Sequence, residues 1–392
     1  MNILHNSSPV FSLALIVVLG SSALAGGIDD PRIRIVDLPV SSDVGFGNWI
    51  FSDDGSSVVT QVEPFRSQSL FRNRGDGWEL VTQRTKTVSP EYTNGISNDG
   101  SALTITGDGH AYLAIDDHII EAPRTWIGND GEVIIEQGIF STALSGDGTT
   151  VGLFGFDPAI GGVVSLIWRG GDALEPLGLG VPESGVSNFI VGFSDDASTI
   201  TGYSSYTGRI NDLRAYPYVQ DAWVLADGVL TMIQVPNATG LDQTTRPLSI
   251  SGDGSTIVGM SFSPIAAGGP FRHFQQLDYE YAYQDGWVWS AQSGGALIGD
   301  PARFREVYPI DLSADGSIVM VVTNGIDSAD GGYYFWTRDG GFVSVTQLVD
   351  QMGILGPWDY FQPVELSDDG KTVMGILSLD GYDFNFAFID LN

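Results

Sequence analysis

A short motif occurs seven times along this chain: an apolar residue, a serine, any residue, an aspartate and usually a glycine. The serines of the motif are Ser52, Ser97, Ser145, Ser194, Ser251, Ser313 and Ser367. Their spacings run from 45 to 62 residues. Repetition at such a period predicts a chain of seven like units, and units of four short strands are typical of a β-propeller.

The aspartate and glycine of the motif indicate a tight turn between two strands. The aspartates are Asp54, Asp99, Asp147, Asp196, Asp253, Asp315 and Asp369, and glycine follows all but one of them, Ala197 being the exception. Glycine tolerates a positive φ, and Ser and Asp side chains bond the free N–H groups of a turn. We interpret these aspartates as structural turn residues. Calcium also prefers oxygen ligands, but no calcium-loop spacing supports it, so neither a metal site nor a cofactor is predicted.

Four strands can be traced in each unit. Apolar residues stand directly before each serine and six residues after it, which predicts a strand on either side of the turn. A third strand is predicted around one aromatic per unit, and a fourth follows a second glycine-containing turn. These aromatics are Phe71, Trp126, Trp168, Trp223, Trp289, Trp336 and Phe388. We expect them to pack between neighbouring blades.

The two ends of the chain complement each other. The seventh unit stops one strand short, at residues 386–392, and a spare strand at residues 33–38 precedes the first repeat serine. That strand can complete the last blade and close the ring. The predicted fold is therefore all-β: residues 26–392 form one seven-bladed β-propeller of four-stranded antiparallel blades, closed by the N-terminal strand.

The repeat resembles a known group of bacterial extracellular proteins. The unit Ser-x-Asp-Gly-x-x-apolar, with an aromatic strand and a Gly-Gly turn after it, is similar to the HAF family and, more distantly, to TolB-like and WD40-like propeller repeats. The His-Ala-Phe triplet of the family survives only as Ala387-Phe388, with a looser match at residues 221–223. The resemblance covers the whole mature chain. It implies a secreted propeller and transfers no catalytic residue.

The first 25 residues are predicted to be a secretory signal. An apolar run at residues 11–19 is followed by Ala23-Leu24-Ala25, which fits an A-x-A cleavage site. No later stretch is long and apolar enough to span a bilayer, so a secreted protein, extracellular or periplasmic, is expected. The chain has no cysteine, which excludes thiol chemistry and Cys-ligated metals.

The charge balance limits the partners. The chain has 17 Lys and Arg against 48 Asp and Glu, a formal net charge of −31. Such a field repels phosphate backbones and anionic membrane surfaces, so nucleic-acid binding is not expected. We expect a monomer whose partner is an extracellular glycan or protein.

No catalytic signature is present. The three histidines after the leader lack a metalloprotease spacing, and no nucleophile elbow, P-loop or dinucleotide fingerprint occurs. Acidic pairs are abundant, which leaves a two-carboxylate glycosidase open.

Two insertions break the sevenfold symmetry and carry the predicted binding site. They lie in the fourth and fifth units, which would be neighbours in a ring, and they are rich in the residue types of binding hot spots. The candidates are Tyr206, Arg209, Arg214, Tyr216, Tyr218, Phe271, Arg272, His273, Tyr279, Tyr281 and Tyr283. One hypothesis is a non-enzymatic binding or scaffold module that uses these loops. The alternative is a polysaccharide hydrolase or lyase with acidic and Tyr residues in the central cleft. Insertions that only pack their own aromatics also remain open.

Overall fold

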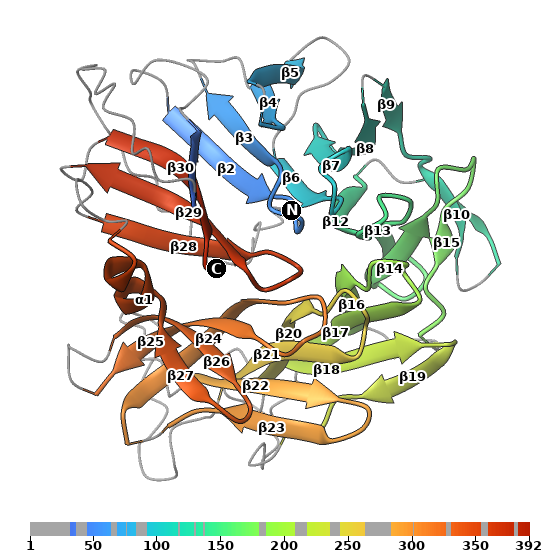
Figure 1. Ribbon diagram of the computed structural model, residues 1–392. Helices are drawn as coiled ribbons and strands as arrows, with labels where there is room; N and C mark the ends of the chain where they lie inside the picture. Colours follow the sequence, from blue (N-terminus) through green and yellow to red (C-terminus); the bar gives the residue numbers. More distant parts are fainter. Residues whose placement is uncertain are drawn as a thin grey trace, which may run out of the picture.

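The structure is a computed structural model. It describes residues 32–36, 45–63, 69–75, 77–83, 92–116, 118–128, 131–135, 138–179, 186–207, 218–235, 244–262, 284–300, 302–326, 331–353, 360–379 and 383–392. Within these residues, seven four-stranded antiparallel sheets are arranged in a ring around a central axis (Figure 1). The predicted seven-bladed β-propeller is confirmed.

In each blade the strand before the Ser-x-Asp turn lies nearest the axis, and the strands follow outward in chain order. Blade 1 contains β2 (Gly45–Phe51), β3 (Val58–Glu63), β4 (Ser69–Asn73) and β5 (Trp78–Gln83). Blade 2 contains β6 (Tyr92–Ile96), β7 (Ala102–Gly107), β8 (His110–Ile115) and β9 (His118–Glu121). A two-stranded hairpin, β10 (Thr125–Ile127) and β11 (Val133–Ile135), leads to the next blade.

The next three blades repeat this arrangement. Blade 3 contains β12 (Phe140–Leu144), β13 (Val151–Asp157), β14 (Gly162–Trp168) and β15 (Glu175–Pro176). Blade 4 contains β16 (Val186–Phe193), β17 (Thr199–Thr207), β18 (Tyr218–Ala226) and β19 (Val229–Met232). Blade 5 contains β20 (Thr244–Ile250), β21 (Thr256–Phe262), β22 (Gln284–Ser290) and β23 (Gly294–Ile298).

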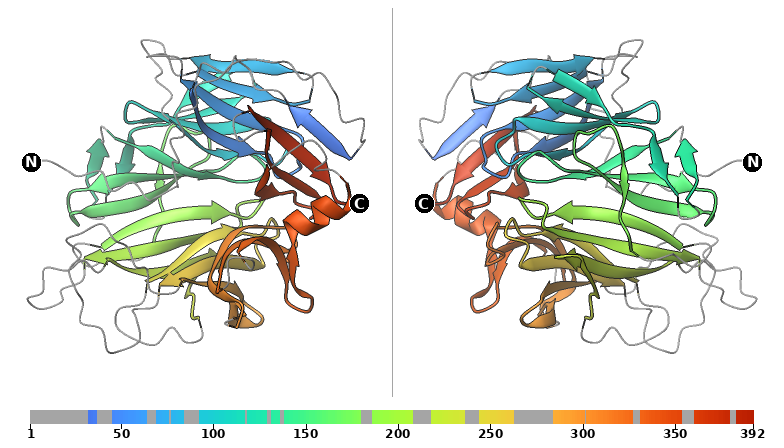
Figure 2. Two further views of the ribbon diagram at one scale, coloured as in Figure 1. Left: turned by 90° about the vertical axis from the view of Figure 1, so that its left-hand side faces the viewer. Right: turned by 90° about the vertical axis from the view of Figure 1, so that its right-hand side faces the viewer.

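Blade 6 is followed by the helix of the described chain. The blade contains β24 (Phe304–Leu312), β25 (Val319–Gly325), β26 (Gly332–Thr337) and β27 (Gly341–Ser344). The helix, α1 (Val345–Gln351), begins at Ser344, whose hydroxyl accepts a hydrogen bond from the Gln347 N–H. It lies on the same side as the C-terminal end of the chain (Figure 2). No helix among the described residues has the length and apolar character needed to cross a membrane.

Blade 7 takes its strands from both ends of the chain. It contains β28 (Tyr360–Leu366), β29 (Thr372–Leu379), β30 (Asp383–Asp390) and, outermost, β1 (Ile33–Val36). β1 pairs antiparallel with β30, from Ile33 opposite Ile389 to Val36 opposite Phe386. The guanidinium of Arg34 lies 3.7 Å from the centre of the Phe388 ring and donates to the Gly55 and Ser56 carbonyls of blade 1.

The core lies between the blades. One cluster joins Val59 and Leu70 of blade 1 to Leu103 and Tyr112 of blade 2. Another joins Val258 and Val288 of blade 5 to Val307 and neighbouring residues of blade 6. Because each sheet buries its faces against its neighbours, the hydrophobic effect stabilises the ring as a whole.

The Ser-x-Asp turns share one hydrogen-bond pattern in all seven units. In blade 5 the Ser251 hydroxyl donates to Asp253 at 2.7 Å and accepts from the Thr256 N–H at 2.9 Å, and Asp253 accepts from the Ser255 N–H at 2.8 Å. The other six units repeat these contacts. These bonds satisfy the free N–H groups of the turn and favour an ionised aspartate.

A belt of backbone hydrogen bonds joins these turns around the axis. In each turn one backbone N–H donates to a carbonyl of the next blade. The donor is either the residue between Ser and Asp or the Asp itself, and the acceptor is always the carbonyl of the residue between Ser and Asp. The seven bonds are Asp54 to Asn98 (3.1 Å), Asn98 to Gly146 (2.9 Å), Asp147 to Asp195 (2.9 Å), Asp195 to Gly252 (2.8 Å), Asp253 to Ala314 (3.0 Å), Ala314 to Asp368 (2.8 Å) and Asp368 to Asp53 (2.7 Å). The last bond returns to blade 1, so the belt is continuous.

The expected aromatic column is only partly correct. Trp126 is not on the third strand of blade 2, which is β8, but on β10 beyond the fourth strand. The other aromatics occupy three registers relative to the repeat serine. Trp168 pairs with Val151, six residues after its serine; Phe388 pairs with Met374, seven after; and Trp223 pairs with Gly202, eight after. Packing is nevertheless their role, since Trp126, Trp168 and Trp223 are all buried. Tryptophan at more than one of these registers fills the space between sheets, so the sequence spacing alone cannot separate them.

Replacing Ala197 by glycine should raise the free energy of unfolding by about 1 kcal/mol. Ala197 has a φ of +56°, in the position where the six other turns have glycine at φ between +65° and +71°. A Cβ is strained in this region, and glycine removes the strain. Urea denaturation measures the change. The reverse variant, Gly254→Ala, should lower stability because its Cβ would meet the Thr199 hydroxyl at 2.6 Å; equal effects of the two variants would contradict this account.

Candidate functional site

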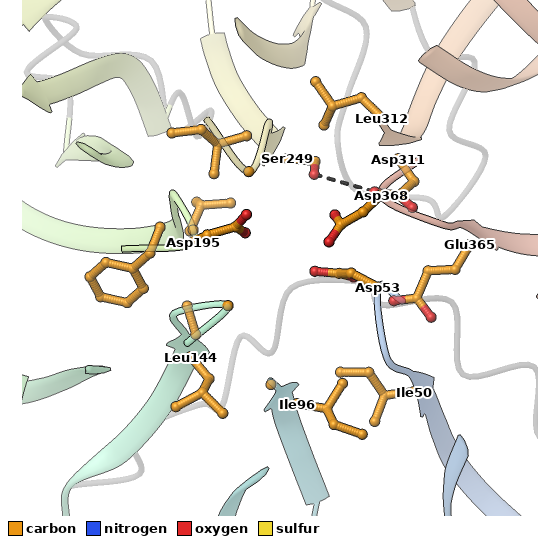
Figure 3. Close-up of a pocket in the computed structure, with 18 of the residues that line it drawn as sticks. Ile50, Asp53, Ile96, Leu144, Asp195, Ser249, Asp311, Leu312, Glu365 and Asp368 are labelled. Carbon is orange, nitrogen blue, oxygen red and sulfur yellow. Dashed lines mark hydrogen bonds between the residues drawn. The ribbon is translucent and has the colours of Figure 1, made fainter. Parts of the chain in front are cut away.

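A cavity of about 190 Å³ lies on the propeller axis. Its walls come from the innermost strands and the Ser-x-Asp turns of the blades. The lining residues with carboxylate side chains are Asp53, Asp195, Asp311, Glu365 and Asp368. Apolar residues of the inner strands, including Ile50, Ile96, Leu144 and Leu312, also line the cavity, whose surface is mainly polar (Figure 3). None of the described residues that line the cavity is Lys, Arg, His or Tyr.

Three of the carboxylates occupy the variable position of the repeat motif. That position, between the serine and the aspartate, is Asp53, Asn98, Gly146, Asp195, Gly252, Ala314 and Asp368 in blades 1 to 7. Its backbone forms the hydrogen-bonded belt, which places its side chain at the axis. In Figure 3, Asp53, Asp195 and Asp368 point toward the middle of the cavity.

The other two carboxylates lie two residues before the motif serine. A β-bulge interrupts the pairing of the innermost strand just before each of them, between Pro309 and Asp311 in blade 6 and between Pro363 and Glu365 in blade 7. A bulge redirects the side chain that follows it, and proline is tolerated there because the ladder is already broken. Here the bulges place Asp311 and Glu365 in the wall of the axial cavity.

Burial and mutual repulsion raise the pKa of four of these carboxyl groups. Desolvation, with repulsion from Asp311, raises the pKa of Glu365 to about 8. Desolvation raises the pKa of Asp311 to about 6, and desolvation with repulsion from Asp195 raises the pKa of Asp368 to about 6. For Asp53, desolvation and the neighbouring acids raise the pKa well above its ordinary value. The cavity holds more carboxyl groups than it can ionise together without a cation.

Few donors serve these carboxyl groups. The Asn98 amide donates to Asp195 at 3.0 Å and to Asp368 at 2.9 Å, and so bridges blades 4 and 7. The Phe51 N–H donates to Glu365 at 2.8 Å, and the Leu366 N–H to Asp311 at 2.9 Å.

Two acceptors at the axis have no donor among the described residues. No hydrogen bond or ion pair from these residues reaches the desolvated Asp53 carboxyl group, which faces neighbouring acids. The side-chain oxygen of Asn98 is buried and accepts no hydrogen bond. A buried acceptor without a donor costs free energy, so a hydrogen-bond donor placed at the Asp53 carboxyl group would be favourable.

The carboxylates do not form a compact metal centre. Nowhere in the described part of the chain do three or more His, Cys, Asp or Glu side chains gather as they would around a metal ion. The acids of the cavity come instead from blades 1, 4, 6 and 7, on different sides of the axis.

The binding residues predicted from the two insertions cannot be compared with this cavity. Nine of them lie outside the described residues: Arg209, Arg214, Tyr216, Phe271, Arg272, His273, Tyr279, Tyr281 and Tyr283. Tyr206 and Tyr218 lie on the described backbone of β17 and β18. Their role therefore stays a prediction.

The sequence did contain a signal for the axial cavity. The variable residue of the motif is acidic in three of seven units, although a turn between strands requires no charge there. In the last three units the order Pro-x-polar-apolar-Ser precedes the turn, as Pro247-Leu-Ser249, Pro309-Ile-Asp311 and Pro363-Val-Glu365. Proline inside an expected inner strand indicates a bulge, and with it a redirected side chain.

The fold and the cavity define a seven-bladed propeller with an acidic axial site. No protein-family model and no curated protein matches the chain. Among solved structures, the chain is similar to the β-propeller domain of the Trilobed protease from Pyrococcus furiosus, with a TM-score of 0.53 and 10% identity over 89% of this chain and 98% of that one. It is also similar to an oligogalacturonate lyase from Vibrio parahaemolyticus, with a TM-score of 0.52 and 11% identity over 91% and 96% of the two chains.

A third similarity, to TolB from Acinetobacter baumannii, has a TM-score of 0.38 and 9% identity over 86% of this chain and 65% of that one. The first two similarities show the propeller fold alone. The resemblance to HAF repeats stays an expectation from the sequence.

Proposed function

We propose that the protein is an exported binding protein that takes positively charged ligands in its axial cavity. The proposal rests on the lining of this cavity, which has five carboxylates and no basic side chain among its described residues. Desolvation, with repulsion from neighbouring acids, raises the pKa of Asp53 and Glu365. Opposite charge within a few ångströms favours the ionised form of a carboxyl group, so a bound cation would offset both effects.

The rest of the molecule suits a binding site. The scaffold is a closed ring with a continuous backbone belt, which holds the cavity in one shape. Pre-organisation of this kind lowers the entropic cost of binding. Export of the chain remains a proposal that rests on the signal-like residues 1–25.

Cations should raise the melting temperature more than sodium chloride at the same ionic strength. A thermal-shift series at pH 8 would compare calcium, magnesium, arginine and simple amines with galacturonate and acetate. Matched ionic strength is needed because salt alone screens a net charge of −31. The stabilisation should be lost in the variant Asp53→Asn/Asp368→Asn. Stabilisation by the anions only, or equal stabilisation by every salt, would contradict the proposal.

A glycosidase is a second candidate, because the pKa of Glu365 near 8 keeps its carboxyl group protonated at neutral pH. A protonated carboxyl beside ionised ones is what general-acid catalysis requires. The acidic wall would repel a uronate polymer, so the substrate would be a neutral glycan. Release of reducing ends from neutral polysaccharides, abolished by Glu365→Gln, would favour this candidate over the binding protein.

A further inference from the structure

We infer that the ligand of the axial cavity is a short linear di- or polyamine. Its ammonium groups would face the carboxylates, and its methylene chain would lie on the apolar residues between them. This inference rests on the proposed function and names its ligand class.

The spread of the carboxylates favours a ligand with separated charges. Asp195 projects from blade 4, while Asp311 and Glu365 project from blades 6 and 7 on another side of the axis (Figure 3). No compact metal-binding group exists among the described residues. A metal ion is best bound by several oxygens converging on one point, whereas a diamine places one charge at each end of a chain. The geometry therefore fits an extended cation better than a single ion.

The Asp53 carboxyl group favours an ammonium group. It lines the cavity, and no hydrogen bond from the described residues reaches it. An ammonium group carries three donors and no acceptor, so it can donate to this carboxyl group and to the neighbouring acids without leaving a group of its own unpaired. A sugar would bring acceptors as well as donors to a wall that already has too many acceptors.

Apolar residues between the carboxylates favour methylene groups between the charges. The cavity surface is mainly polar, but the inner-strand residues Ile50, Ile96, Leu144 and Leu312 also line it (Figure 3). Alkyl chains of amines bury favourably against such side chains, as the stem of a lysine does. The cavity volume of about 190 Å³ is below the roughly 300–1,000 Å³ of pockets for drug-sized ligands. A slender chain fits this space better than a sugar ring.

Isothermal titration of the full chain with 1,4-diaminobutane and with spermidine, at pH 8 and low salt, tests the inference. We expect saturable binding to one site. The variant Asp53→Asn/Asp368→Asn should bind at least tenfold more weakly. Methylammonium, which has neither the chain nor the second charge, should also bind at least tenfold more weakly than the diamine.

A matched control separates the site from overall charge. The variant Asp172→Asn/Asp339→Asn also replaces two aspartates, but at exposed positions. Its dissociation constant for the diamine should lie within twofold of that of the wild type. Removal of Asp53 and Asp368 relieves repulsion between acids, so a folding defect is not expected to mimic the loss. Circular dichroism and the melting temperature of each variant check this.

Each other outcome counts against the inference. If calcium or arginine binds in an Asp53-dependent way and the amines do not, the inference fails and the proposed function stands. If no cation binds, both fail. Equal weakening in the site and control variants would show attraction by net charge only, which also overturns the inference.

Discussion

Replacing Arg72 by methionine should lower the free energy of unfolding by about 3 kcal/mol. Arg72 is 2% exposed and joins blade 1 to blade 2. Its guanidinium donates to the Gly100 carbonyl at 3.0 Å and the Ser101 carbonyl at 2.9 Å, and it pairs with Glu79. Methionine fills much of the same space but leaves both carbonyls without these donors. Urea denaturation followed by tryptophan fluorescence would measure the loss.

The neighbouring Arg74 provides the control. It is partly exposed and pairs with Glu79 at 3.6 Å and Asp116 at 3.4 Å, in contact with solvent. Surface ion pairs contribute little, so Arg74→Met should change the free energy of unfolding by less than about 1 kcal/mol. Similar losses in the two variants would show that burial of the Arg72 guanidinium is not what stabilises this seam.

The protein should become less stable as the pH rises from 5 to 9. Glu365 titrates near 4.5 when unfolded and near 8 in the fold, so above pH 4.5 only the folded state keeps its proton. The stabilisation is complete below pH 4.5, and it is lost as the pH rises through 8. The loss is on the order of 5 kcal/mol for this group. Asp311 and Asp368, with pKa values near 6, add to it in the same direction.

The variant Glu365→Gln isolates this contribution. Its amide resembles the protonated carboxyl group, so the variant should match the wild type at pH 5 and exceed it in stability at pH 9. Urea denaturation at pH 5, 7 and 9 would show the difference. The exposed substitution Glu175→Gln is the control, and it should leave the slope unchanged. A wild-type stability that rises between pH 5 and 9 would refute the assignment.

The turn aspartates give stability the opposite pH dependence: their contribution is lost as the pH falls. Hydrogen bonds from Ser198 hold the pKa of Asp196 below its ordinary value, and those from Ser317 and Ser313 do the same for Asp315. Their stabilisation is present above the unfolded pKa near 4 and is lost as the pH falls through the lower folded values. We therefore place the stability maximum near pH 4 to 4.5.

The fold could be predicted from the sequence because the same turn hydrogen bonds recur in every unit. Ser251 and Asp253 bond the same turn N–H groups as their six counterparts, so local chemistry alone identifies every blade boundary. Trp126 was misplaced because β9 and β10 are both short and a hairpin follows the blade. Sequence spacing counts residues and cannot show that a further hairpin has been inserted.

The axial site could not be predicted in the same way. Asp53 and Asp195 are 142 residues apart and meet only because the ring closes. Their position in the motif varies from blade to blade, so a search for what the units share passes over it. The high pKa of Glu365 depends on burial and on Asp311 from another blade, which no local pattern contains.

The backbone belt has a consequence for how this molecule could change its specificity. Neighbouring blades are joined at the axis by N–H and C=O groups that every residue except proline possesses. The backbone thus holds the ring together at these seven positions, and side chains add to it where Asn98 bridges Asp195 and Asp368. Replacing acids there by neutral or basic residues, one blade at a time, would change which ligand the cavity binds. The backbone scaffold would keep its structure.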